Sequence, residues 1–214
     1  MHLILNQSKP PQTPFAPQWR YHLGYELISN IDFKKIAKII LKKEKYILKK
    51  FPPSTKSSID GYTGLGKNSL TSRYEHIDIF SWWPEAEIKK LKPIVLDFHS
   101  RFLKEIKIKG LPHSHFDLKG WTNVMRKGER IKAHLHSTEP TSYLSGHICV
   151  QCQDTATYYI NPVNQLNEPY TQKIPNEVGQ IVLFPTCVPH YTDTQLGNKE
   201  RITLAFDFSF KTKS

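Results

Sequence analysis

The sequence predicts an α+β protein in which a helical N-terminal region precedes an all-β core. Two observations carry this prediction. Apolar residues recur at helical spacing within 33–48 and 88–102. After Gly110 the residue pattern changes, and short runs rich in β-branched and aromatic residues alternate with clusters of turn-forming residues. We therefore expect a single domain over 1–214, with a helical and loop region at 1–110 and a β core at 111–214.

The first element expected is an extended arm, because residues 1–20 are rich in proline and polar residues. A strand is predicted over 21–28. A helix is predicted over 31–50, with Asn30 as its N-cap and Phe51-Pro-Pro as its end. Its apolar side chains form one stripe, so its many lysines form a solvated opposite face.

A long loop over 54–69 is expected to follow this helix, and the partial alternation of 72–82 predicts a strand. Pro84 then opens a second helix, in which Pro93 marks a kink or a second start. From their loop positions, Arg73 and the segment Gly61–Gly66 are candidates for contacts with a substrate.

The C-terminal half shows many short predicted strands separated by turns, which is typical of a sandwich or barrel. The strands are expected at 115–126, 131–137, 144–152, 155–160, 180–185 and 201–210.

Composition excludes several classes of protein. With 38% hydrophobic residues the chain can bury a core, and no apolar stretch approaches the roughly 20 residues of a membrane helix. The N-terminus has only a four-residue apolar patch and no charged lead, so we expect no signal peptide and a cytoplasmic protein without a membrane partner. The net charge of +11 attracts nucleic acid, but the lysine face of the first helix explains much of it, and a nucleic-acid partner is not favoured.

Three cysteines, an odd number, argue against a disulfide framework. Cys149 and Cys152 form a CxxC, but residues three apart on a strand point to opposite faces. With no second CxxC, a structural role is favoured over zinc or redox chemistry.

Histidines provide the chemical signal. His134 and His136 lie two apart in a predicted strand, so their rings project from the same face. Neutral imidazoles at adjacent positions suit iron, zinc, copper or nickel. His190 follows a distant strand and a Pro-bounded turn, and it can supply the third ligand that one strand cannot.

A late strand predicts an anion site beside the histidines, because Arg201 and Thr203 share one face with Ala205. A cation and a hydroxyl beside a small residue fit a carboxylate, which arginine can hold with two hydrogen bonds.

These motifs resemble the Fe(II)/2-oxoglutarate-dependent oxygenase superfamily, particularly its prolyl-hydroxylase-like bacterial and phage members. The resemblance covers about 115–210 and rests on Trp121-x-Asn123, His134-x-His136, Ser145-Gly146, Phe184-Pro185, His190 and Arg201.

The resemblance implies a double-stranded β-helix (a jelly-roll, cupin-like core) with the N-terminal helical region packed on it. It also implies Fe(II) bound by His134, His136 and His190, and 2-oxoglutarate held by Arg201 with Thr203. The expected reaction is hydroxylation of a small-molecule or peptide substrate, with release of succinate and CO2.

Residues near the predicted site extend it. Asn123 can hydrogen-bond 2-oxoglutarate or a ligand histidine. Tyr158 is a candidate cofactor contact, and a core role is equally open for it and for Tyr159. His113, His115 and His147 are interpreted as structural or exposed.

The sequence departs from the family at one ligand, because the usual pattern is His-x-Asp/Glu and position 136 is histidine. Glu139 is the alternative carboxylate ligand, although its spacing from His134 places it on the wrong strand face.

Two other functions stay open. Near-matches to both cupin motifs allow a cupin-type metal enzyme or binding protein that does not use 2-oxoglutarate. Because nucleic-acid-dealkylating oxygenases use the same barrel, the basic charge also allows a nucleic-acid-modifying oxygenase.

Overall fold

The computed structural model describes residues 1–55, 60–109, 112–136, 140–162 and 169–211. The strands are β1(His2–Gln7), β2(Arg20–Leu27), β3(Phe116–Met125), β4(Ser142–Gln151), β5(Ala156–Ile160), β6(Thr171–Pro175), β7(Gln180–Pro185), β8(His190–Thr192) and β9(Arg201–Phe210). The helices are α1(Phe33–Lys50), α2(Ile79–Trp82), α3(Ala86–Lys89) and α4(Leu91–Glu105), with the 3-10 turns η1(Thr71–His76) and η2(His113–His115).

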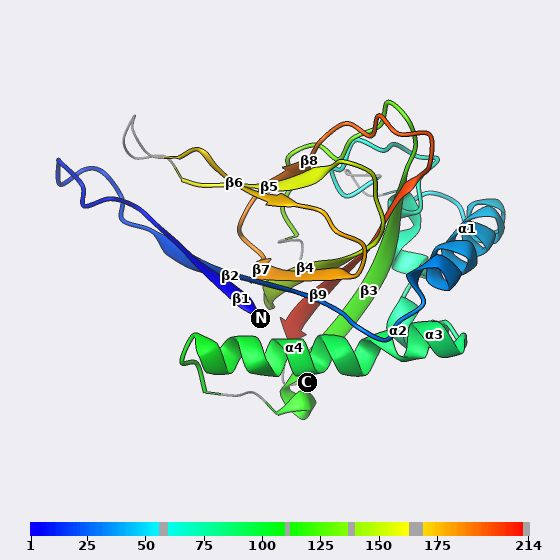
Figure 1. Cartoon of the computed structure of the whole chain (residues 1–214), viewed down its shortest axis with the longest axis horizontal. Helices are drawn as coiled ribbons and strands as arrows, with labels where there is room; N and C mark the ends of the chain where they lie inside the picture. The colour runs from blue at the N-terminus through cyan, green and yellow to red at the C-terminus, as the bar shows by residue number, and fades with distance from the viewer. Residues whose placement is uncertain (56–59, 110–111, 137–139, 163–168, 212–214) are drawn as a thin grey trace.

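Among the described residues, the strands form two antiparallel sheets that face each other (Figure 1). The large sheet has the order β1-β2-β7-β4-β9-β3, and the small sheet has the order β6-β5-β8. Helix α4 runs across the outer side of the large sheet, and α1 lies beside the same sheet (Figure 1). The predicted jelly-roll core with helices packed on it is thereby confirmed.

Two apolar clusters hold these layers together. The larger lies between the helices and the large sheet and includes Ile36, Phe98 and Phe206. The smaller lies between the two sheets and includes Tyr159 and Phe184. The central strand β7 is covered on both faces, which explains why its sequence is apolar without alternation.

The two faces of strand β9 have different roles, one in the apolar core and one in the candidate site. Its even-numbered residues from Ile202 to Phe208 pack toward the helices. Its odd-numbered residues therefore point between the two sheets, since successive side chains alternate in a strand. Every odd-numbered residue from Arg201 to Asp207 lines a cavity there.

Helix α1 begins two residues later than expected. Asp32, whose carboxylate accepts from the Lys35 amide at 2.9 Å, is the N-cap. Asn30 instead has a φ of +62° and belongs to the preceding turn. The stripe of apolar residues is buried as predicted, and the buried Glu44 pairs with Arg126 at 2.7 Å.

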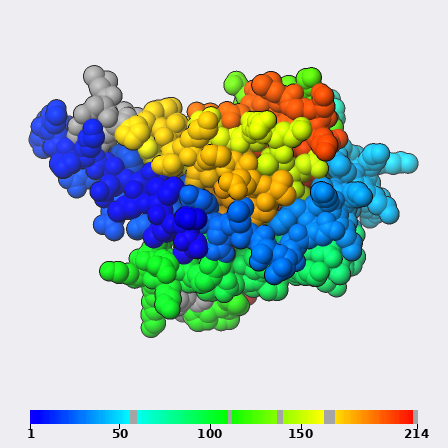
Figure 2. Space-filling model, in the orientation of Figure 1, coloured from blue at the N-terminus to red at the C-terminus, as the bar shows by residue number. Residues whose placement is uncertain are grey.

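Three further expectations about local structure are wrong. The N-terminal arm contains β1, which pairs with β2, so residues 1–110 add two strands to the large sheet. Figure 2 shows this N-terminal segment in dark blue beside the yellow strands of the small sheet. Residues 72–82 form η1 and α2 instead of a strand. The segment 131–136 makes only one isolated bridge, between His134 and His190.

Local hydrogen bonds explain the helical turns in 72–82. The Ser72 hydroxyl donates to the Ser69 carbonyl at 2.7 Å, and Asp78 caps α2 through the Phe80 amide at 3.1 Å. Short polar side chains that bond nearby backbone favour turns over a strand ladder. In the next element, Pro93 lies in the first turn of α4, so of the two predicted roles it marks a second start and not a kink.

The interpretation that Cys149 and Cys152 face apart is also wrong, because the two thiols lie close enough for each to shift the pKa of the other. A register irregularity between Cys149 and Gln151 turns the chain, and Cys152 lies just beyond β4. Interaction with the Cys149 thiol lowers the pKa of Cys152 to about 7, and the Cys152 thiol donates to the Asn176 carbonyl oxygen at 3.4 Å. Among the described residues, the only cluster of three or more metal-ligating side chains is elsewhere.

No helix in the described part of the chain has the length and apolar character needed to cross a membrane.

Candidate active site

The three predicted histidines meet between the two sheets. The His134 and His190 backbones exchange two hydrogen bonds of 3.1 Å, which hold the 131–136 segment against the start of β8. The ring centroids lie 4.4 Å apart for His134 and His190, and 5.0 Å apart for His136 and His190. One ring nitrogen from each histidine lies within 4.8 Å of the others.

Each ring is oriented by a hydrogen bond on its outer side. The Nδ1 atoms of His134 and His190 face the carbonyl oxygens of Lys132, at 2.9 Å, and Val188, at 3.3 Å. His136 Nδ1 lies 2.8 Å from an Asp207 carboxylate oxygen. All three partners are acceptors, so each Nδ1 carries the proton and each Nε2 keeps a free lone pair for a metal ion.

The electrostatic surroundings keep two of these rings neutral. Burial, followed by repulsion from His136, lowers the pKa of His134 to about 4. Burial, with repulsion from the neighbouring histidines, holds the pKa of His190 well below its usual value. Neutral imidazole is the form that binds a metal ion, so the donor set fits Fe(II).

Arg201 lies in the wall of a small cavity, of about 30 Å³, that the three histidines also line. Its side chain is 1% exposed, and its Nη2 donates to the Thr157 hydroxyl at 3.2 Å. Its Nε and Nη1 have no hydrogen-bond partner among the described residues. A buried cation with free donors is costly, and a bound carboxylate would satisfy it.

Other polar side chains surround this cation. Thr203 and His147 line the same cavity. His147 Nε2 and the Tyr159 hydroxyl are buried and lack a hydrogen-bond partner in the described part of the chain. Burial, followed by the charge of Arg201, lowers the pKa of His147 to about 3, so this ring is neutral. These unpartnered groups fit the distal carboxylate of 2-oxoglutarate.

Two expectations about this pocket need correction. Tyr158 stacks on Tyr191, with ring centroids 4.9 Å apart, and Lys173 lies over its ring, so its side chain points away from the histidines. Its neighbour Tyr159 stacks on His190 and is fully buried. His147, interpreted as structural or exposed, lies in the cavity wall.

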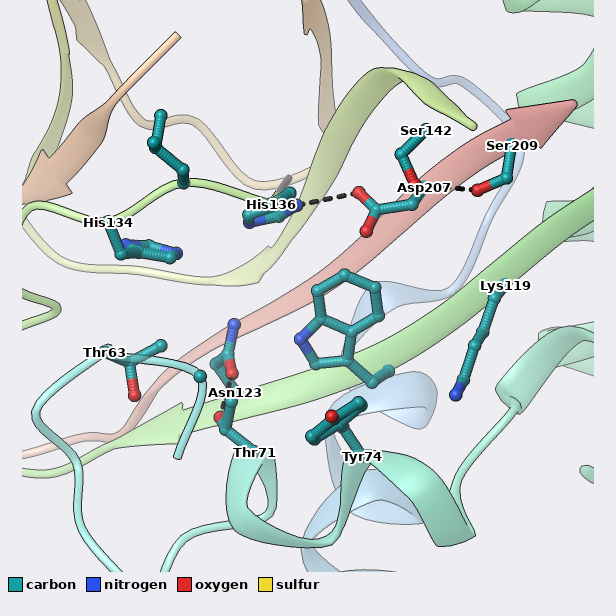
Figure 3. Close-up of a pocket in the computed structure, with 13 residues that line it drawn as sticks. Thr63, Thr71, Tyr74, Lys119, Asn123, His134, His136, Ser142, Asp207 and Ser209 are labelled. Carbon is teal, nitrogen blue, oxygen red and sulfur yellow. Dashed lines mark hydrogen bonds and ion pairs between the residues drawn. The ribbon is translucent and has the colours of Figure 1, made fainter. Parts of the chain in front are cut away.

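Asn123 is buried on β3 and lines both this cavity and a larger one. Its side-chain oxygen accepts a hydrogen bond from the Thr71 hydroxyl, which orients the amide (Figure 3). The amide nitrogen consequently points toward the space beside His134 (Figure 3).

The larger cavity, of about 200 Å³, is also lined by His134 and His136. Trp121 forms part of its wall, with its ring 5.2 Å from that of His136. Tyr74 and Lys119 lie farther from the histidines (Figure 3).

Of the predicted substrate contacts, Gly61 lines the larger cavity. Arg73 does not lie in its described lining, because the guanidinium donates to the backbone carbonyls of Phe51, Lys67 and Ser69. Glu139, the alternative metal ligand, lies outside the described residues.

Asp207 is the site residue that sequence reasoning missed. It lies on the same face of β9 as Arg201 and Thr203. Extending the alternation from Arg201 through Ala205 by one more step would have found it.

Comparison with known proteins agrees with this geometry. Residues 119–207 match the family described as "Putative 2OG-Fe(II) oxygenase". No curated protein sequence matches the chain.

Several solved structures share the fold. A Pseudomonas putida prolyl-4-hydroxylase is 12% identical with a TM-score of 0.57, and the match covers 87% of this chain and 92% of that one. A Trichoplax adhaerens prolyl hydroxylase, in complex with a hypoxia inducible factor peptide fragment, is 12% identical with a TM-score of 0.55, covering 87% and 83%. EvdO2 from Micromonospora carbonacea, complexed with 2-oxoglutarate, is 13% identical with a TM-score of 0.52, covering 88% and 86%.

The structural likenesses establish the jelly-roll fold, while the family match and the three-histidine cluster concern the chemistry. Together they show that residues 119–207 carry the features of a 2OG-Fe(II) oxygenase, an enzyme whose cofactors are Fe(II) and 2-oxoglutarate.

Proposed function

We propose that this enzyme hydroxylates a small molecule or a peptide side chain, with His134, His136 and His190 as its iron ligands. Arg201 and Thr203 hold the distal carboxylate of 2-oxoglutarate. One observation carries this proposal: the cavity lined by the three histidines is also lined by a buried arginine with two unpartnered donors.

The arginine supports a dicarboxylate cofactor because its burial needs a compensating anion. Burial lowers the pKa of Arg201, because removing the guanidinium from water disfavours its charged form. No carboxylate pairs with Arg201 in the described part of the chain, and its one bond is to Thr157. A bidentate carboxylate supplies both the missing charge and the missing acceptors.

Fe(II) held by the three histidines would supply the oxidising power for hydroxylation, with 2-oxoglutarate and dioxygen as co-substrates that yield succinate and CO2. The protein contributes orientation and exclusion of water. Hydrogen bonds to Lys132, Val188 and Asp207 fix the directions of the three rings. We expect the amide nitrogen of Asn123, which lines both cavities, to donate to a cofactor oxygen.

The substrate occupies the larger cavity, which adjoins His134 and His136. Its volume of about 200 Å³ suits a small molecule or one side chain of a peptide. Trp121 and Tyr74 provide aromatic surface, and four hydroxyl side chains in the wall can orient polar groups: Thr63, Thr71, Ser142 and Ser209.

The alternative of a cupin-type protein that does not use 2-oxoglutarate would leave Arg201 without a role. The alternative of a nucleic-acid substrate rests on basic charge, and part of that charge is paired with carboxylates of the same chain. Lys43 pairs with Glu85 at 2.9 Å and Lys35 with Glu87 at 3.5 Å.

We further propose that 1–214 is one folding unit. Helices α1 and α4 contribute Ile36 and Phe98 to the same apolar cluster as Phe206 of the β core. Strand β2 joins β7 within the large sheet. Neither half buries its apolar face without the other.

Anaerobic addition of Fe(II) and 2-oxoglutarate tests the function. We expect the weak visible charge-transfer band of a chelated 2-oxo acid, and succinate on aeration in the presence of an accepted substrate. An Arg201→Met variant should need far more 2-oxoglutarate for the same band. Absence of the band, with no succinate formed across a substrate panel, would refute the proposal.

A further inference from the structure

The three candidate metal ligands are all histidines, which bind a metal ion as neutral imidazoles. Three neutral imidazoles leave bound Fe(II) one unit more positive than two imidazoles and a carboxylate would. A carboxylate beside the ligands would offset part of that charge.

A carboxylate lies directly behind His136. Asp207 Oδ1 accepts from His136 Nδ1 at 2.8 Å and from the Ser145 hydroxyl at 2.7 Å (Figure 3 shows the first of these bonds). The side chains of His136 and Asp207 are 6% and 16% exposed. Ser145 is fully buried, so two donors hold one oxygen of Asp207 in a largely enclosed place.

We infer that Asp207 is a positioning residue that holds His136 in its Nδ1–H tautomer and supplies a negative charge one hydrogen bond behind the metal ligand. This inference rests on the proposed role of His136 as a metal ligand. A histidine whose outer nitrogen donates to a carboxylate is a stronger and better oriented ligand than an isolated imidazole.

The other two histidines show that orientation alone does not require a carboxylate. Lys132 and Val188 orient His134 and His190 through neutral backbone carbonyls. Among the described residues, His136 alone of the three rings has an anionic hydrogen-bond partner. Asp207 therefore brings a negative charge close to the ligand set, which the two backbone carbonyls cannot do.

The first test reads the tautomer in metal-free protein. Long-range ¹H–¹⁵N spectra of ¹⁵N-histidine protein should show His136 as a single Nδ1–H tautomer. In an Asp207→Leu variant we expect a mixture of tautomers at His136, with His134 and His190 unchanged as internal controls of folding. An unchanged His136 tautomer in that variant would overturn the orienting role.

The second test reads metal affinity, using Fe(II) alone under anaerobic conditions and Co(II) as a coloured probe. Asp207→Asn keeps the shape and an acceptor oxygen but removes the charge. We expect it to weaken metal binding by roughly 10- to 100-fold and to shift the Co(II) spectrum. Asp117→Asn, on an exposed carboxylate of β3, is the matched control and should change neither.

Ser145→Ala provides a milder variant that keeps the carboxylate, and it should weaken metal binding less than Asp207→Asn. Metal affinity within twofold of wild type in Asp207→Asn would overturn the electrostatic role. A failure of the proposed function would look different, because wild-type protein would bind no Fe(II). The tautomer measurement in metal-free protein would still report on the Asp207–His136 bond in that case.

Discussion

Replacing Arg201 with methionine should have opposite effects on cofactor binding and on the stability of the cofactor-free protein. The guanidinium is 1% exposed, and its Nε and Nη1 are without partners among the described residues. Those two donors are free for the distal carboxylate of 2-oxoglutarate. Methionine has a similar length but carries neither the charge nor the donors.

The magnitude follows from the two hydrogen bonds. A hydrogen bond to a charged group contributes about 1.5–3 kcal/mol, so losing two of them costs about 3 kcal/mol or more. Such a loss weakens 2-oxoglutarate binding by a factor of roughly 100 or more. Without cofactor, the variant no longer buries an unpaired charge, and we expect its free energy of unfolding to rise by about 1–3 kcal/mol.

The assay compares two 2-oxo acids in anaerobic titrations of the visible band. Wild type should bind 2-oxoglutarate far more tightly than 2-oxobutyrate, which lacks the distal carboxylate. Arg201→Met should bind both about equally. Arg201→Lys should lie between them, because lysine keeps the charge but loses the two-donor geometry.

Two results would refute this reasoning. One is a variant that still discriminates strongly between the two acids, which would place the carboxylate elsewhere. The other is lower stability of the cofactor-free variant with unchanged cofactor affinity, which would make Arg201 a structural residue.

His136→Ala should lose iron and His136→Asp should retain it, as measured by the metal content of the purified variants. Full iron occupancy in His136→Ala, with loss of iron in Glu139→Ala, would reassign the ligand to Glu139. Burial lowers the pKa of His99 to about 4, so the unfolded chain binds more protons between pH 6.5 and 4, and the free energy of unfolding must fall as the pH falls through that range. Allowing for partial solvent screening, we expect a loss of about 1–2 kcal/mol by urea denaturation at pH 7 and 4.5, and a His99→Gln variant with the same pH slope would contradict this. Gly146→Ala should destabilise by about 1–3 kcal/mol or more, because a Cβ would lie 2.4 Å from the Phe206 ring and from the Val182 carbonyl oxygen; an unchanged urea midpoint would count against the packing. Salt-titrated binding should show no retention of single- or double-stranded nucleic acid, and micromolar affinity with a steep salt dependence would restore that substrate class.

The sequence by itself determined the elements whose signals are local. Apolar spacing located α1, and the strands β7 and β9 have the predicted bounds. The HxH, the distal histidine and the alternating Arg201 and Thr203 were sufficient to propose a metal site beside an anion site. In each case the side-chain direction follows from the period of one helix or one strand.

Only the tertiary structure decided which face of some strands is inside. Strand β5 carries Tyr158 and Tyr159 side by side, so alternation could not choose between them. Pairing of Tyr159 with His190 settles the choice by turning Tyr159 inward. The irregularity at Cys149 likewise brings two thiols together that a regular strand would separate.

The partners of the site residues also came from tertiary structure. Asp207 lies 71 positions from His136, and the Arg201–Thr157 bond spans 44 positions. Such contacts depend on how β9 registers against β4 and on how the small sheet covers the large one, which no single segment of the chain encodes. The sequence therefore identified the candidate metal ligands, whereas strand register determined the groups that orient them and compensate their charge.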